Sequence, residues 1–103
     1  MRLSTDEKIE LAKKIEGKLV GITLSEWNKW QSYVKVYGLK RGLEFAKVLK
    51  DSPSLRPGQK QSYRTILEVM RRYQKELNQL SKEELAEILG YIGRWIVARR
   101  VRL

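Results

Sequence analysis

The sequence contains no cysteine and no histidine. It therefore lacks the commonest side chains for nucleophilic catalysis, for proton transfer at neutral pH and for binding of transition metals. The absence of cysteine also excludes a disulfide scaffold and favours an intracellular, cytoplasmic protein. These absences favour binding over chemistry, and we predict a protein that is not an enzyme and uses no cofactor and no metal ion.

Sequence motifs of enzymes are also missing. The chain has no glycine-rich phosphate loop, no G-x-S-x-G motif and no acidic metal-binding cluster. Three nearby carboxylates, Glu83, Glu84 and Glu87, fall in the first turns of the last expected helix. Acidic groups at that end of a helix interact favourably with its dipole, so they need no catalytic explanation.

Long apolar segments are absent as well. No run approaches the roughly 20 apolar residues of a membrane span, and the first residues, MRLSTDEK, do not resemble a secretory signal. We therefore expect no membrane partner. Both prolines lie in residues 51–60, DSPSLRPGQK. We predict a single domain over residues 1–103, with helical halves 1–50 and 61–103 joined by this Pro-rich loop.

Positive charge is abundant and unevenly placed. The chain has 22 Lys and Arg against 12 Asp and Glu, a formal net charge of +10. Residues 27–50 and 53–75 each carry six basic groups and one acidic group, whereas residues 76–93 are acidic. Solvated helix surfaces are one explanation, but surfaces rich in lysine usually pair it with glutamate. A polyanionic partner explains the imbalance better.

Helix signals dominate the chain. Ser4 with Glu7, Thr23 with Glu26 and Ser81 with Glu84 have the spacing of capping boxes. Apolar residues then recur at steps of three and four, which predicts five helices. They cover residues 4 to about 17–21, 23–38, 39–50, 61–80 and from 81 onward. The expected fold is all-α, a small single-domain helical bundle.

The aromatic residues divide into two expected groups. Trp27, Trp30 and Trp95 lie on apolar faces at helical spacing, so we expect them in the core. Tyr37 continues the face that begins at Trp27, whereas Tyr33 is the aromatic residue of that helix expected to be exposed. Gly42 costs roughly 1 kcal/mol inside a helix, which indicates close packing against another backbone.

The basic residues of the third and fourth expected helices form two ridges. Arg64, Arg71 and Lys75 align on the fourth helix, and Lys40 aligns with Lys47 on the third. Such ridges can follow the phosphate backbone of RNA or DNA and bind it through release of counterions. The predicted nucleic-acid-binding residues are Lys35, Lys40, Arg41, Lys47, Lys50, Arg56, Lys60, Arg64, Arg71, Arg72, Lys75, Arg99 and Arg100.

Two other functions fit the same residues. The expected helices on either side of Gly38 could form a helix-turn-helix pair, with Lys40, Arg41 and Glu44 near the bases of a DNA site. This alternative is a small archaeal or viral DNA-binding protein. The other is a protein-interaction adaptor or inhibitor whose basic surface docks on an acidic protein.

Residues 33–51, YVKVYGLKRGLEFAKVLKD, resemble the small subunits of CRISPR effector complexes, particularly those of the type III Cmr and Csm assemblies. The segment 84–98, with its YIGRWI, is similar to the closing helix of those subunits, and residues 1–22 have no counterpart. The resemblance implies a non-catalytic small subunit of a ribonucleoprotein that contacts guide, target or displaced strands through their phosphates. Its implied partners are other subunits of that complex, further copies of itself among them. Lys40, Arg41 and Lys47 lie within the resembling segment.

Overall fold

Six α-helices make up a computed structural model that describes residues 3–101, and the side chains of residues 3–99. They are α1 (Thr5–Lys18), α2 (Leu24–Tyr37), α3 (Leu39–Leu49), α4 (Pro57–Arg72), α5 (Gln74–Asn78) and α6 (Lys82–Val101). The described residues include no strand, which confirms the all-α prediction. Within the described residues, none of the helices is both long enough and apolar enough to cross a bilayer.

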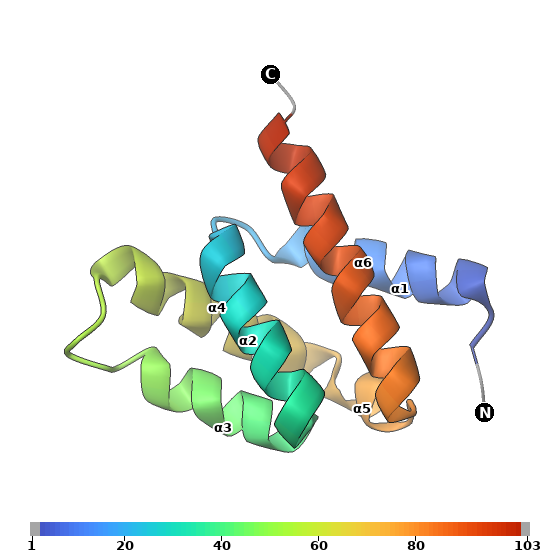
Figure 1. The fold of residues 1–103 in the computed structure, drawn as a ribbon, viewed down its shortest axis with the longest axis horizontal. Helices are drawn as coiled ribbons and strands as arrows, with labels where there is room; N and C mark the ends of the chain where they lie inside the picture. The colour runs from blue at the N-terminus through green and yellow to red at the C-terminus, as the bar shows by residue number, and fades with distance from the viewer. Residues whose placement is uncertain (1–2, 102–103) are drawn as a thin grey trace.

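Helix α2 occupies the middle of the bundle (Figure 1). An antiparallel hairpin of α3 and α4 packs on one side of it, and α6 packs on the other. Helix α1 lies against α6, and the short α5 leads from α4 into α6. The two helices predicted to carry the basic ridges, α3 and α4, are therefore neighbours at one side of the molecule.

The helix starts follow the predicted capping residues, with one difference. Ser4 and Ser81 each form a complete capping box with the glutamate three residues later. The hydroxyl of Thr23 accepts from the Glu26 amide at 3.3 Å. The Glu26 side chain does not complete that box, because it is buried and accepts from Gln59 Nε2 at 3.2 Å.

Glu84 does more than cap α6. Its carboxylate accepts hydrogen bonds from the backbone amides of Leu3, at 2.8 Å, and Ser81, at 3.2 Å. These two backbone donors hold the pKa of Glu84 below its usual range. The side chain is buried. Glu84 thus fastens the segment before α1 to the start of α6.

Helix α4 begins earlier and ends earlier than predicted. Pro57 occupies its first turn, and the side chain of Gln59 accepts from the Arg56 amide at 2.9 Å. The connection is therefore residues 50–56 and not 51–60, since proline is tolerated at the first helical position. At the other end Tyr73 has φ −102° and ψ 6°, outside helical geometry, and it separates α4 from α5. The predicted single helix over residues 61–80 is therefore wrong.

The core joins all six helices. Trp27 and Trp30 are fully buried, as predicted, and their rings lie 5.4 Å apart. The prediction for Trp95 is wrong, because its side chain is only half-buried, and Lys13 of α1 lies 5.5 Å from the centroid of its ring. The other large side chains that are fully buried are Ile15, Leu19, Tyr63, Ile66, Met70, Leu77, Ile88, Leu89, Ile92 and Ile96.

Two tyrosines of α2 exchange their expected environments. Tyr33 stacks on Phe45 of α3, with centroids 4.1 Å apart and planes at 6°, so it is half-buried and not exposed. Tyr37, expected on the inner face, is 52% exposed and lies 6.0 Å from the Arg41 guanidinium. The contact with α3 explains the position of Tyr33, because it adds a second packing surface beside the line of Trp27, Trp30 and Val34.

Gly42 is the contact point of α2 and α3. A β-carbon at this position would collide with Val34 Cγ2, and the indole of Trp30 donates to the Gly42 carbonyl at 2.7 Å. The chain turns between these two helices through Gly38 alone, at φ 91°, a backbone conformation that side-chain-bearing residues rarely adopt. The two glycines set how closely the hairpin approaches the bundle.

Candidate nucleic-acid interface

Most of the predicted nucleic-acid-binding residues lie in the hairpin formed by α3, residues 50–56 and α4. We call this segment, residues 39–72, the basic hairpin. It contains nine basic residues and three acidic ones, Glu44, Asp51 and Glu68. The nine are Lys40, Arg41, Lys47, Lys50, Arg56, Lys60, Arg64, Arg71 and Arg72. Seven of them are exposed, and Lys50 and Lys60 are half-buried.

The periodicity of each helix explains why these residues face solvent. The apolar side of α4 is buried through Tyr63, Ile66, Leu67 and Met70. Residues at 64, 68, 71 and 72 therefore lie on the opposite side of the helix. In α3, burial of Leu39, Gly42 and Ala46 likewise leaves residues 40, 41, 44 and 47 exposed.

The two helices carry the same charge pattern on their exposed sides. On α3 the order is Lys40, Glu44, Lys47, and on α4 it is Arg64, Glu68, Arg71. In each helix the two cations are seven residues apart, which corresponds to about 10 Å along the axis. The central carboxylate lies one turn from each cation. Each ridge therefore consists of two positive charges with one negative charge between them.

The turn end of the hairpin concentrates cations around one carboxylate. Lys50 Nζ lies 2.7 Å from Asp51 Oδ2. Lys50 first, and then Arg64 and Lys60 through their charges, hold the pKa of Asp51 below its usual range. Three cations thus lie near a single anion, which leaves an excess of positive charge for a phosphate.

The open end of the hairpin is basic as well. Because the two helices run in opposite directions, the start of α3, with Lys40 and Arg41, lies toward the end of α4, with Arg71 and Arg72 (Figure 1). All four side chains are exposed. Within the side chains that the structure describes, no ion pair involves any of these four. They are free to contact an external anion.

Four predicted binding residues lie outside the hairpin. Lys35 is exposed on α2, beside Gly38 and Lys82 in a small hollow. Lys75 is exposed but belongs to α5, so the break at Tyr73 removes it from the predicted continuous line with Arg64 and Arg71. Arg99 donates to Glu16, at 2.9 Å, and to the Leu19 carbonyl, at 3.1 Å, and so helps to hold α6 against the end of α1. The side chain of Arg100 lies outside those that the structure describes.

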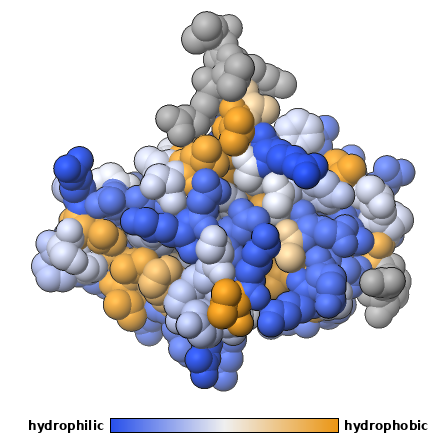
Figure 2. Space-filling model, in the orientation of Figure 1, coloured by the Kyte–Doolittle hydropathy of each residue, from blue (hydrophilic) through white to orange (hydrophobic). Residues whose placement is uncertain are grey.

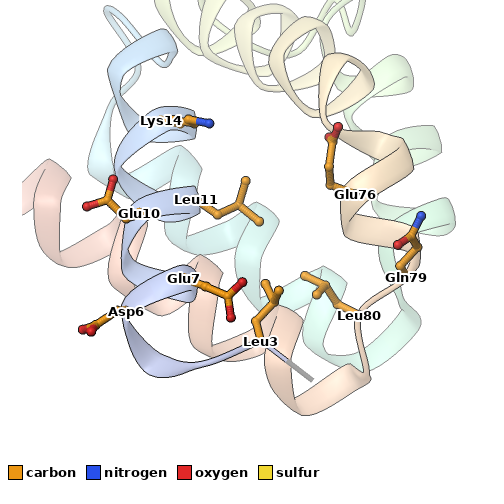
Figure 3. A pocket seen from close by; sticks show the side chains of 9 residues that line it. All are labelled: Leu3, Asp6, Glu7, Glu10, Leu11, Lys14, Glu76, Gln79 and Leu80. Carbon is orange, nitrogen blue, oxygen red and sulfur yellow. The ribbon is translucent and has the colours of Figure 1, made fainter. Parts of the chain in front are cut away.

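A groove of opposite charge lies between α1 and α5. Its volume is about 460 Å³, and its apolar floor comprises Leu3, Leu11 and Leu80 (Figure 3). Its other lining residues are Asp6, Glu7, Glu10, Lys14, Glu76 and Gln79. Among the described residues, no group of three or more carboxylates is placed to hold a metal ion. With four carboxylates and one lysine in its lining, the groove is unsuited to binding a polyanion.

Apolar side chains are also exposed at the hairpin, where Val48 of α3 is 68% exposed. Figure 2 shows that hydrophilic side chains cover most of the face viewed there, with small separate hydrophobic areas among them. A surface of this kind suits a hydrated, charged ligand better than an apolar one. The charge of the hairpin is therefore its main recognition feature.

Comparison with known proteins gives no relative for this chain. No family model, no curated protein and no solved structure matches it.

Proposed function

We propose that the chain is a non-catalytic module that binds RNA or DNA through the phosphate backbone, without reading sequence. The observation that carries the proposal is the basic hairpin, in which two adjacent helices present unpaired Lys and Arg side chains on their exposed sides. Phosphate contacts by such side chains position a protein on a nucleic acid but carry no sequence information directly. The resemblance of residues 33–51 to small subunits of CRISPR effector complexes supports a place for the module within a larger ribonucleoprotein.

The salt dependence of binding tests the proposal. Fluorescence anisotropy with labelled RNA and DNA of several sequences, single- and double-stranded, should give similar affinities for different sequences of one type. Each neutralised phosphate contributes a slope of about −0.9 for duplexes and about −0.7 for single strands in a plot of log K against log salt. We expect an overall duplex slope steeper than about −3, because at least four exposed cations of the hairpin can contact phosphates. A slope near zero contradicts the proposal.

The two central carboxylates of the hairpin should weaken this binding. Replacing both Glu44 and Glu68 by glutamine removes two charges that repel phosphates. At about 8 Å in water each repulsion amounts to roughly 0.5 kcal/mol, so we expect affinity to rise about fivefold at low salt. The gain should disappear at 0.5 M salt because of screening.

A matched pair of exposed carboxylates provides the control for this prediction. Glu10 and Glu83 lie outside the hairpin, on α1 and α6. Replacing both by glutamine changes the net charge of the protein by the same amount. An equal gain in affinity from the two double variants would assign the effect to net charge and not to the hairpin.

The helix-turn-helix alternative has one supporting observation. Lys40 and Arg41 are exposed at the start of α3, where a recognition helix contacts bases. However, α2 and α3 are joined by Gly38 alone, whereas that motif uses a turn of about three or four residues. Selection from a random DNA library separates the two proposals, because enrichment of a defined motif supports the helix-turn-helix protein and contradicts sequence-independent binding.

The adaptor alternative requires an acidic protein in place of a nucleic acid. It is tested by capture of partners from an extract treated with nuclease. An acidic protein that remains bound after this treatment, combined with no measurable binding to purified oligonucleotides, would replace our proposal by this one.

A further inference from the structure

A second concave site lies between α1 and α6, outside the basic hairpin. It has a volume of about 340 Å³ and is lined by Lys13, Glu16, Trp95, Ala98 and Arg99. Trp95 is half-buried there, unlike the fully buried Trp27 and Trp30. The pocket thus combines a flat aromatic side chain with cations. Because Trp95 is only half-buried, part of its side chain is accessible to a ligand.

The two cations of this pocket have different roles. Arg99 is fixed, because its guanidinium is held by the Glu16 carboxylate at 2.9 Å and by the Leu19 carbonyl at 3.1 Å. Lys13 is exposed and lies 5.5 Å from the centroid of the Trp95 ring. In the described part of the chain Lys13 forms no ion pair. Its long, flexible side chain can therefore leave the ring for a stronger anion such as a phosphate.

We propose that this pocket binds one unpaired nucleobase, stacked on the indole of Trp95, while Lys13 contacts the adjacent phosphate. The inference rests on the proposed function, and it specifies single strands as the preferred ligand. Stacking of a base on an aromatic side chain tolerates any sequence, because every base has a π-face. The charge of Glu16 is offset by Arg99, so Lys13 leaves the pocket with a net positive charge. An aromatic surface next to a cation suits a nucleotide better than a simple acidic group, which would use only the cation.

The test compares two ligands that differ only in their bases. One is a labelled 12-nucleotide oligo(dT), and the other is an abasic strand of the same length and charge; about 12 nucleotides lies within the usual site size. We expect the protein to bind oligo(dT) at least about fivefold more tightly than the abasic strand, because one stacked base contributes at least about 1 kcal/mol of binding free energy. Trp95→Ala should bring the two affinities close together, and Trp95→Phe should retain part of the preference. Val97→Ala, on the same helix but outside this pocket, should leave the preference unchanged.

Tryptophan fluorescence gives an independent readout in the unaltered protein. Because Trp27 and Trp30 are buried, quenching by a bound strand reports Trp95. Oligo(dT) should quench this emission at saturation, and the abasic strand should not. This measurement tests whether a base binds at Trp95 even if the Trp95→Ala variant does not fold. Thermal denaturation followed by circular dichroism shows whether the variant is folded.

Three outcomes overturn the inference. If Trp95→Ala is folded and keeps the full preference for oligo(dT), or if oligo(dT) does not quench the emission, the base does not bind at Trp95. Continued binding of the abasic strand would then leave the proposed function of the basic hairpin intact. If neither strand binds the unaltered protein, both proposals are wrong.

Discussion

Replacing Lys40, Arg41, Arg64 and Arg71 together by glutamine should reduce the affinity for duplex nucleic acid by roughly 10²- to 10³-fold at 0.1 M salt. These four exposed side chains include one cation at each end of the α4 ridge and both cations at the start of α3. Each phosphate contact that is lost removes about 0.9 from the salt slope, so the slope should also become less steep by about three to four. Anisotropy measured at several salt concentrations gives both quantities. Lys75 is excluded from the set because it belongs to α5.

The matched control removes four exposed cations from other surfaces. Lys14, Lys18, Lys29 and Arg94 lie on α1, α2 and α6, and replacing them by glutamine produces the same net charge. We expect the control to lose no more than about fivefold in affinity, since unpaired charges farther than about 8 Å from the ligand are largely screened at physiological salt. Equal losses in the two variants would show that the protein attracts nucleic acid by overall charge, without a defined binding surface.

Gly42→Ala should destabilise the protein by about 1–3 kcal/mol, which is the usual cost of overpacking a well-packed contact. The new methyl group would overlap Val34 Cγ2. Valine in a helix has one strongly preferred rotamer, so Val34 cannot easily turn away, and α2 and α3 must separate. Separation would also strain the hydrogen bond from Trp30 to the Gly42 carbonyl. A typical domain is stable by about 5–15 kcal/mol, so this loss is measurable by urea denaturation.

A second glycine provides the comparison for Gly42. A β-carbon at Gly17, in the last turn of α1, would meet no atom within 4 Å. Gly17→Ala should therefore stabilise the protein by about 0.4–1 kcal/mol, through the lower entropy of the unfolded chain. If Gly42→Ala were as stable as the unaltered protein, α2 and α3 would not be in the close contact that positions the basic hairpin.

Local signals in the sequence account for most of the helices. Capping residues and apolar spacing predict the starts of α1, α2 and α6. Gly42 predicts close packing against another backbone, and the structure shows this close packing against the side chains of Val34 and Trp30 instead. The break at Tyr73 had no such signal, because neither glycine nor proline marks it and the apolar spacing continues through it. The predicted start of α4 is wrong because the Pro-Gly pair at residues 57–58 indicates a loop, although proline is equally compatible with a first helical turn.

The environments of several side chains depend on contacts between segments that are far apart in the chain. The spacing of residues along the sequence does not reveal such contacts. Tyr33 is covered by Phe45 of α3, and Lys13 of α1 lies over the ring of Trp95. Arg99 has Glu16 as its partner across 83 positions of the chain, which no local pattern reveals. The exposed cations of α3 and α4, in contrast, followed from helical periodicity alone, because burial of one side of a helix fixes which residues lie on the other.

The basic hairpin, with nine basic and three acidic residues, carries +6 of the net charge of +10, so the positive field of the protein is strongest on that side. As the molecule diffuses toward a negatively charged strand, this field exerts a torque that turns the hairpin toward the strand. A larger fraction of collisions then occurs in a productive orientation, so the association rate constant rises above the roughly 10⁵–10⁷ M⁻¹s⁻¹ of unguided protein encounters.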